Sequence, residues 1–308
     1  MRIFSGQAHR VLAERIATYL GQMLGDVKIE RFPDGEVCVK IVDSVRGQDV
    51  FIVQPTCFPP NENLMELLIM IDAARRASAA RITAVMPFYG YARQDRKDQP
   101  RVPITAKLVA NLLVAAGVNR ILAMDFHAQQ VVGFFDIPVD HLFAAPVIVK
   151  HLREMKIPDL VVVAPDPGGL KMAYAYSNKL EAGLAVVAKQ RRSATEVEAM
   201  NIVGEVANCN CVLVDDLCTT GGTLYAAAEL LKKRGAKRIL AAVTHAVLTD
   251  EAILRLKKSP IETMVTTDSV PPKDWQGFPV EVLSVAELLG EAILRIHNNQ
   301  SVTSLFNI

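Results

Sequence analysis

Short, uninterrupted apolar runs recur along the chain, and they are its clearest pattern. Each ends at a proline or a polar residue, as in DVFIVQP from Asp49, RITAVMP from Arg81, RILAMD from Arg120, LVVVAP from Leu160, LAVVAK from Leu184, CVLVDD from Cys211 and RILAAVTH from Arg238. A strand covered by helices on both faces reads as a continuous apolar run, whereas a half-exposed strand alternates. The runs therefore predict strands buried inside parallel sheets.

Helical patterns lie between most of these runs. NENLMELLIMIDAARRAS begins at Asn61, and PITAKLVANLLVAAG begins at Pro103, which suits the first helical position because proline lacks the N–H that this position leaves unused. Alternating strands and helices predict an α/β fold with mostly parallel sheets flanked by helices and joined by right-handed crossovers. Ligands of such sheets bind at the carboxyl ends of the strands, where the polar clusters of this sequence fall.

One helix–strand segment occurs twice. NLLVAAGVNRILAMDFHA from Asn111 and ELLKKRGAKRILAAVTHA from Glu229 share LL, G, RIL and HA at equal spacing. We interpret the segment as a helix, a glycine C-cap and a strand used in both halves of the chain. A chain of 308 residues is also long enough for two domains. We expect domains at 1–145 and 146–308, with the last helix able to pack back on the first domain.

Composition and charge narrow the class of protein. Apolar residues form 51% of the chain, yet windows such as LMELLIMI from Leu64 are cut by a charge before about 18 residues, so we expect no membrane span. The N-terminal MRIFSGQAHR lacks the apolar core of a secretion signal, which predicts a cytoplasmic protein. Basic and acidic residues balance at 34 and 33, so no general basic field is expected for nucleic acid. Five cysteines without a CxxC pair predict reduced packing residues.

The segment CVLVDDLCTTGGTLYAAAELL, residues 211–231, carries the most specific chemistry. The strand CVLV is expected to deliver Asp215 and Asp216 at its carboxyl end, and the turn CTTGGT leads into the helix LYAAAELLKK. Glycine amides and threonine hydroxyls at a helix N-terminus form a seat for an oxyanion, and the acids can hold vicinal hydroxyls or a hydrated magnesium ion. A sugar phosphate satisfies both halves of this site. The alternative is a capped helix start with an incidental Asp pair.

This segment is similar to the phosphoribosyl diphosphate motif, which phosphoribosyltransferases also use. Further motifs run in order along nearly the whole chain: RFPDGE (31–36), FYGYARQDR (88–96), RVPITAKLVA (101–110), DFHAQQVVGFFDIPVD (125–140), VVAPDPGG (162–169) and MNIVGEV (200–206). Together they resemble the ribose-phosphate diphosphokinase family, the phosphoribosyl pyrophosphate synthetases. The resemblance implies two similar phosphoribosyltransferase-like domains, with ATP loops in the first and ribose-phosphate and diphosphate loops in the second. It also implies transfer of the diphosphoryl group of ATP to the anomeric hydroxyl of ribose 5-phosphate, with release of AMP.

The resemblance assigns roles residue by residue. ATP binding falls on two loops, with Phe32, Asp34 and Glu36 in one and Arg93, Gln94, Asp95 and Arg96 in the other. Ribose-phosphate binding falls on Asp215, Asp216, Thr219, Thr220, Gly221, Gly222 and Thr223. Lys189 and Arg191 match the catalytic cations of a flap, and His127 and Asp166 match ligands of the cofactor Mg²⁺. Asp166 also precedes two glycines whose amides are expected to be free to approach a diphosphate.

The residues alone leave plainer interpretations open. FPDGE is also typical of an ordinary turn, the 93–96 loop of a solvated charged loop, and the cations at 189 and 191 of a basic surface turn. Histidine is an unusual ligand for a hard cation, so His127 alone is more typical of a hydrogen-bonding residue at a strand end. His245 holds the equivalent position of the repeat and is interpreted as a structural relic.

Three departures from the family pattern reduce the number of charged side chains around the expected substrates. Thr219 stands in place of the third aspartate of the motif, Gln190 in place of an arginine, and GGLKMAYAYS, with Leu170 and Lys171, lacks arginines common after the two glycines. Two alternatives stay open: a non-catalytic or weakly active regulatory homologue, and a phosphoribosyltransferase, against which the ATP loops count. The family assembles as dimers within hexamers, so a homo-oligomer is expected, with neither nucleic acid nor membrane as a partner.

Overall fold

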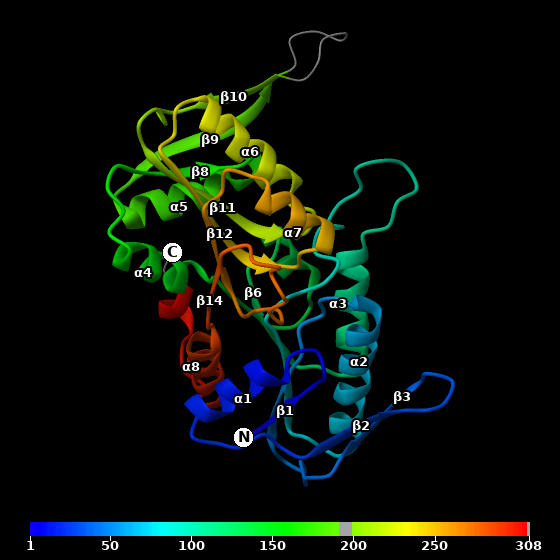
Figure 1. Cartoon of the computed structure of the whole chain (residues 1–308). Helices are drawn as coiled ribbons and strands as arrows, with labels where there is room; N and C mark the ends of the chain where they lie inside the picture. Colours follow the sequence, from blue (N-terminus) through cyan, green and yellow to red (C-terminus); the bar gives the residue numbers. More distant parts are fainter. Residues whose placement is uncertain (191–198, 307–308) are drawn as a thin grey trace. The chain divides into compact units, whose positions relative to one another are not determined.

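The computed structural model describes residues 1–190 and 199–306, and the chain divides into two compact units (Figure 1). The first unit comprises Met1–Phe143, Ser269–Pro271 and residues 284–306. The second unit comprises Ala144–Asp268 and Pro272–Leu283. The C-terminal helix therefore belongs to the same unit as the N-terminal strand.

A parallel sheet forms the centre of the first unit. Its order is β1 (Arg2–Ser5), β4 (Asp49–Val53), β5 (Arg81–Met86), β6 (Arg120–Met124) and β7 (Val139–Leu142), and every neighbouring pair is parallel. Consecutive residues Phe51, Ile52 and Val53 of β4 are all buried, although their side chains point to opposite faces in turn. Both faces of the sheet are therefore covered, which explains the uninterrupted apolar run.

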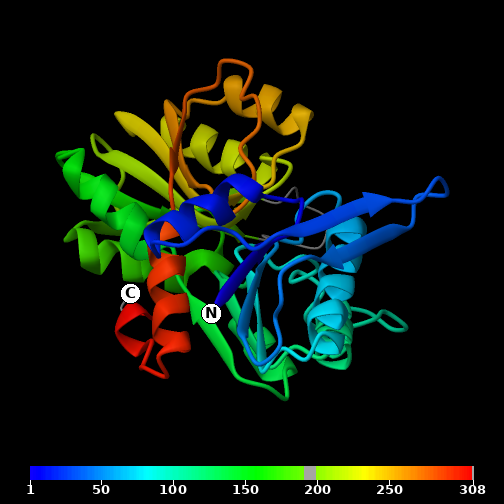
Figure 2. The ribbon, with the colours of Figure 1, turned by 90° about the horizontal axis from the view of Figure 1, so that it is seen from below.

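Helices cover both faces of this sheet. α2 (Pro60–Arg76) packs beside α3 (Thr105–Ala116) on one face, and α1 (Arg10–Tyr19) packs beside α8 (Ala286–His297) on the other (Figure 1 and Figure 2). A Cβ atom on Gly290 would lie 2.5 Å from the ring of Tyr19, so the absence of a side chain there lets α8 approach α1. Two short 3-10 turns complete the unit, η1 (Gln129–Phe134) and η3 (Thr303–Phe306).

An antiparallel hairpin projects from the first unit. It consists of β2 (Val27–Arg31) and β3 (Val37–Ile41), and β3 packs against α2 (Figure 1). The apolar side chains of both strands, such as Val27, Ile29 and Val39, pack against the core that α2 and α3 form with the sheet. The base of the hairpin is therefore anchored on α2, whereas its turn, residues 32–36, is exposed.

The second unit has a larger sheet of mostly parallel strands. Its order is β10 (Ala199–Val203), β9 (Gly183–Gln190), β8 (Leu160–Ala164), β11 (Asn210–Cys218), β12 (Arg238–Ala246), β13 (Thr263–Thr267) and β14 (Val280–Leu283). Only β10 runs antiparallel to its neighbour among the strands of this sheet that the structure describes. α4 (Ala145–Glu154) packs with α5 (Leu170–Leu180), and α6 (Gly222–Lys233) packs with α7 (Asp250–Lys257); the two pairs lie on opposite faces (Figure 1).

The expected α/β class with mostly parallel sheets flanked by helices is confirmed, and the repeat has the expected form. α3 ends at Gly117, which has φ +112°, and leads into β6; α6 leads through Gly235, with φ +86°, into β12. Both glycines hold the left-handed backbone conformation that commonly ends a helix. A residue with a side chain would be strained in this conformation, so glycine is favoured there.

Three element boundaries differ from the sequence expectation. α3 begins at Thr105, so Pro103 lies before the helix instead of at its first position. β11 continues through both aspartates to Cys218 because its ladder to β12 runs on to Ala246, and α6 begins at Gly222, two residues earlier than expected. In residues 1–190 and 199–306, no helix has both the length and the apolar character needed to cross a bilayer.

Candidate functional site

The carboxylates expected to bind ribose lie on the central strand of the second unit. β11 is flanked by β8 and β12, and Asp215 pairs with Val243 in the ladder to β12. Asp215 and Asp216 are both half-buried, and the carboxylate of Asp215 accepts the backbone N–H of Asp216 at 3.0 Å. Because the strand continues to Cys218, both acids lie within the strand, and the ladder pairing of Asp215 keeps them out of a loose turn.

Asp166 lies close enough to Asp215 to act on it electrostatically. Burial is the largest cause that raises the pKa of Asp215 well above its ordinary value, and the negative charges of Asp216 and Asp166 push the pKa in the same direction. Asp166 follows β8, the strand next to β11, so the parallel order of the sheet brings its carboxylate to the same edge. A cation or a donor-rich ligand at this edge would relieve the repulsion between Asp166 and Asp215.

The two glycines after Asp166 differ from the sequence expectation. The Oδ1 atom of Asp166 accepts the N–H of Gly168 at 2.8 Å and that of Gly169 at 3.2 Å, and it caps the 3-10 turn η2 (Pro167–Gly169). The prediction that these amides are free to approach a diphosphate is therefore wrong for this conformation. The physical reason is that an aspartate at an N-cap position accepts hydrogen bonds from the amides two and three residues later.

The loop after β11 forms the start of α6. Gly221 has φ +67° and precedes the first helical residue, and a Cβ atom on it would lie 3.2 Å from Leu256. Gly222 and Thr223 are in the first turn, whose amides have no carbonyl four residues earlier in the helix. A helix start of this kind favours an oxyanion, so the loop is compatible with the seat that the sequence predicts.

Two residues from α7 and the turn before it hold this loop in place. The N–H of Thr249 donates to the carbonyl oxygen of Thr219 at 3.1 Å, and Nη1 of Arg255 donates to that of Thr220 at 2.7 Å. Arg255 also lies beside Gly222. A Cβ atom on Gly222 would lie 3.4 Å from Nη1 of Arg255. Sequence reasoning missed Arg255, since it lies 35 residues after the loop and has no local motif.

The first expected ATP loop is the turn of the β2–β3 hairpin. Phe32 N–H donates to the carbonyl oxygen of Glu36 at 2.9 Å, and Gly35 N–H donates back to that of Phe32 at 2.8 Å. The carboxylate of Asp34 accepts the N–H of Glu36 at 3.2 Å. These bonds define the turn and leave Phe32 53% exposed, so its ring offers an apolar surface for stacking.

The second expected ATP loop lies between β5 and α3, in the same unit. The carbonyl oxygen of Gln94 accepts the N–H of Ala106, and its side chain accepts the hydroxyl of Thr105 at 2.5 Å, so the loop is tied to the first turn of α3. Asp95 accepts a hydrogen bond from Gln130. Arg93 and Arg96 are exposed. The loop thus has a fixed backbone with two cations at its surface.

The two histidines of the repeat occupy different environments. His127 is exposed in the loop after β6, where the N–H of the preceding Phe126 donates to Nε2 of His141 at 2.9 Å. His245 is 2% exposed and lies within β12, opposite Leu217 of β11. The difference arises because β6 ends at Met124, whereas β12 continues to Ala246.

One of the two expected catalytic cations lies in the second sheet. Lys189 is in β9, where its backbone pairs with that of Met200 in β10. Arg191 lies outside the described residues. Among the departures, Leu170 and Lys171 begin α5 directly after η2.

The carboxylates of the second unit fit the Mg²⁺ ion that the resemblance implies. Mg²⁺ is a hard cation that is usually held by one or two carboxylates together with water and substrate phosphates. Asp166 stands near Asp215, whose pKa its negative charge helps to raise, so a cation bound at this edge would favour the charged form of both carboxylates. Over the described ranges 1–190 and 199–306, no group of three or more His, Cys, Asp or Glu side chains is arranged as a metal-binding cluster.

Comparisons with known proteins agree on one family. The model for the N-terminal domain of ribose phosphate pyrophosphokinase matches residues 1–117, and the model for the phosphoribosyl synthetase-associated domain matches residues 191–307. The chain is 50% identical to a ribose-phosphate pyrophosphokinase from Gloeobacter violaceus over 308 residues, covering 99% of this chain and 93% of the relative. The chain belongs to the ribose-phosphate pyrophosphokinase family.

Further members of the ribose-phosphate pyrophosphokinase family extend this result. Ribose-phosphate pyrophosphokinase 1 of Spinacia oleracea is 52% identical over 310 residues, covering 99% of this chain and 92% of the relative. The crystal structure of phosphoribosylpyrophosphate synthetase from Mycobacterium smegmatis superimposes with a TM-score of 0.91 at 41% identity, covering 97% of this chain and 99% of that one. The family and the fold that the motifs predict are therefore confirmed along the whole chain.

Proposed function

We propose that this chain transfers the diphosphoryl group of ATP to the anomeric hydroxyl of ribose 5-phosphate, giving phosphoribosyl diphosphate and AMP for nucleotide biosynthesis. One observation carries the proposal: Asp215 and Asp216 lie on a strand that leads directly into the N-terminus of α6, in a chain that matches ribose-phosphate pyrophosphokinases over 99% of its length. Acids for sugar hydroxyls and amides for a phosphate are the two halves of a sugar-phosphate site.

The ribose 5-phosphate would be held by the second unit. Asp215 and Asp216 would accept hydrogen bonds from the ribose hydroxyls, and the loop from Thr219 to Thr223 would bind the 5-phosphate through its amides and hydroxyls. Arg255 and Thr249 already fix the carbonyl groups of this loop, so its amides keep one direction. Such preorganisation aligns the anomeric hydroxyl without a nucleophilic side chain.

The nucleotide would be held by the two loops of the first unit. The exposed ring of Phe32 offers a face for adenine, and Asp34 and Glu36 offer acceptors for the nucleoside. Arg93 and Arg96 offer planar forks of donors for phosphate oxygens.

The transfer step needs the protein to stabilise developing charge and does not need a side chain that bonds covalently to the substrate. The acceptor hydroxyl attacks the β-phosphorus and gives up its proton to solvent, the bond between that phosphorus and the α–β bridging oxygen breaks, and negative charge grows on the AMP that leaves. Lys189 and Arg191 would stabilise that charge. Mg²⁺, for which we propose His127 and Asp166 as ligands, neutralises charge on the phosphate oxygens when bound.

The reaction products decide the proposal directly. Purified protein with ATP, Mg²⁺ and ribose 5-phosphate should form AMP and phosphoribosyl diphosphate in equal amounts, followed by ³¹P NMR and nucleotide chromatography. Omitting ribose 5-phosphate should abolish AMP formation. ADP as the main nucleotide product would contradict the proposal, because it would indicate transfer of a single phosphoryl group.

The same assay separates the alternatives. A regulatory homologue would form no AMP under any of these conditions. A phosphoribosyltransferase would release diphosphate from phosphoribosyl diphosphate in the presence of a nucleobase, without ATP. The similarity to pyrophosphokinases over the full chain favours the synthetase.

We also propose that the protein works in the cytoplasm as a homo-oligomer of dimers within a hexamer. The family resemblance supports this proposal. Light scattering of the purified protein should give a mass several times the 33.7 kDa of one chain. A single-chain mass at the concentrations of the activity assay would contradict it.

A further inference from the structure

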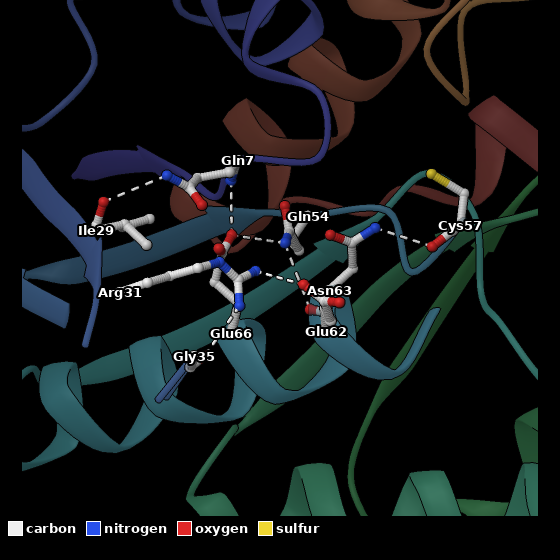
Figure 3. Close-up of polar contacts among 9 residues, drawn as sticks. All are labelled: Gln7, Ile29, Arg31, Gly35, Gln54, Cys57, Glu62, Asn63 and Glu66. Atoms are coloured by element: carbon white, nitrogen blue, oxygen red, sulfur yellow. Dashed lines mark hydrogen bonds and ion pairs between the residues drawn. The ribbon is translucent and has the colours of Figure 1, made fainter. Parts of the chain in front are cut away.

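A buried carboxylate lies under the base of the hairpin that carries Phe32, Asp34 and Glu36. Glu66 of α2 is 2% exposed, and its Oε1 atom accepts the backbone N–H of Gln7 at 2.6 Å and Nε2 of Gln54 at 2.8 Å (Figure 3). Gln54 is itself fully buried and follows β4. Burying a carboxylate is costly unless it is hydrogen-bonded, and these two donors offset part of that cost.

Gln54 fills the space between Glu66 and the loop after β1. Its Oε1 atom accepts the N–H of Ala8 at 3.1 Å, and its Nε2 atom also approaches the carbonyl oxygen of Asn63 at 3.4 Å. A Cβ atom on Gly6 would lie 2.3 Å from the side-chain oxygen of Gln54, so only glycine fits there. Glu66 therefore ties the loop of residues 6–8 to α2 in a single arrangement.

Two contacts extend this network to the hairpin. Nε2 of Gln7 donates to the carbonyl oxygen of Ile29 in β2 at 3.3 Å. At the end of β2, Nη2 of Arg31 donates to Glu62 at 2.5 Å, one helical turn before Glu66, and Nη1 donates to the carbonyl oxygen of Gly35 inside the turn at 3.2 Å (Figure 3). Arg31 thus connects α2 to the turn of the hairpin.

The charges of Glu66 and Arg31 act on each other. Burial raises the pKa of Glu66 above its ordinary value, and the negative charge of Glu62 adds to that rise. The hydrogen bonds from Gln7 and Gln54 and the positive charge of Arg31 oppose it. A neutral glutamine at position 66 could accept the same two hydrogen bonds through its own Oε1 atom. What glutamine could not supply is the negative charge that faces Arg31.

We propose that Glu66 is a positioning residue for the nucleotide, and that its charge, acting with Glu62 on Arg31, sets the placement of the Phe32–Glu36 turn on which ATP affinity depends. This inference rests on the proposed function, because it takes that turn as part of the ATP site. Neither Glu66 nor Arg31 needs to touch ATP for this role.

A double-mutant cycle on the full chain tests the inference. Arg31→Gln should raise the KM for ATP about tenfold and Glu66→Gln about fivefold, the scale of losing one charge-assisted hydrogen bond or a close charge pair. The double variant should be no worse than Arg31→Gln alone, because both changes remove the same interaction. The kcat and the KM for ribose 5-phosphate should stay within about twofold in every variant.

Arg76→Gln is the matched control. It removes an exposed ion pair, Arg76 with Asp72, from the other end of the same helix, and it should leave both KM values unchanged. Additive effects of Arg31→Gln and Glu66→Gln, or an unchanged KM for ATP in Glu66→Gln, would overturn the inference. A matching loss of kcat and of ribose 5-phosphate affinity would also overturn it, since that pattern indicates general damage.

Calorimetric titration of ATP separates this inference from the proposed function. If the wild type binds ATP but forms no AMP, the proposed function fails, and the weaker binding expected in Glu66→Gln and Arg31→Gln still decides the positioning role. If the wild type forms AMP and binds ATP no more tightly than Glu66→Gln, Arg31→Gln and the double variant do, only the inference fails. A wild type that does not bind ATP would overturn both.

Discussion

Arg81 and Asp49 stand opposite each other at the starts of the neighbouring parallel strands β5 and β4, and their side chains form an ion pair. Nε of Arg81 donates to Oδ1 of Asp49 at 2.9 Å, and Nδ1 of His297 lies 2.8 Å from Oδ2 of the same carboxylate. Arg81 also donates to the carbonyl oxygen of Ile296 at 2.9 Å. The pair thus joins two strands of the first unit to the last turn of α8, more than 200 residues later in the chain.

Asp49→Asn should destabilise the first unit. The carboxylate side chain is only 11% exposed, so the substitution leaves the guanidinium of Arg81 without its ionic partner in a partly buried place. We expect the free energy of unfolding to fall by about 2–3 kcal/mol, the scale of a hydrogen bond to a charged group. Urea unfolding measures the change, and Arg76→Gln, which breaks an exposed pair, should change it by less than about 0.5 kcal/mol.

Acid should affect the wild type more than Asp49→Asn. Burial alone would raise the pKa of Asp49, but the hydrogen bonds from Arg81 and His297 outweigh it and lower the pKa below its ordinary value. A lowered folded-state pKa stabilises the fold above the unfolded pKa, about 4, and the stabilisation is lost as the pH falls through the folded value. The unfolding free energies of the two proteins should therefore differ at pH 6, and the difference should shrink as the pH falls to about 3. A gap that stays constant with pH would contradict this account.

Arg255→Gln should weaken binding of ribose 5-phosphate. The substitution removes the donor that holds the carbonyl oxygen of Thr220, so the amides of the loop lose their fixed direction. We expect the KM for ribose 5-phosphate to rise about tenfold, with the KM for ATP changed less than about twofold. Arg255→Lys is the partner variant and should recover part of the affinity, because it keeps a donor without the fork.

Thr219→Asp should improve the use of ribose 5-phosphate. Threonine keeps the backbone and a small hydroxyl but lacks the charged acceptor for ribose hydroxyls that the family motif has at this position. The carbonyl oxygen of Thr219 accepts the N–H of Thr249, a backbone bond that the substitution retains. We expect a gain of roughly tenfold in kcat/KM for ribose 5-phosphate with the KM for ATP unchanged. A slower variant would show that threonine is an adapted part of this site.

Lys189→Ala should lower kcat by roughly 10²-fold or more, the scale of removing a preorganised charge from a developing anion, with little effect on ATP binding. Lys233→Ala, an exposed lysine in the last turn of α6, is the control and should leave kcat unchanged. Single-turnover kinetics would place the loss on the transfer step. Equal rates for the two variants would return Lys189 to the role of a surface cation.

The sequence by itself determined the class of fold and the family. Its apolar runs predicted buried parallel strands because a strand covered on both faces carries mostly apolar side chains. The repeat around Gly117 and Gly235 predicted the same helix–strand unit in both halves. The ordered motifs predicted the pyrophosphokinase family. All of these signals are local, or are set by spacing along the chain, so no tertiary contact was needed to find them.

Only the tertiary structure decided which distant residues act together. Arg255 reaches the loop of Thr220, Glu66 lies beneath the hairpin base near Arg31, and Asp49 meets His297, yet none of these pairs has a pattern in the sequence. The ladder between β11 and β12 kept the two aspartates inside a strand, and the earlier end of β6 left His127 exposed while His245 is buried. Strand ends, hydrogen-bond partners and burial depend on what packs alongside, which the order of residues alone does not specify.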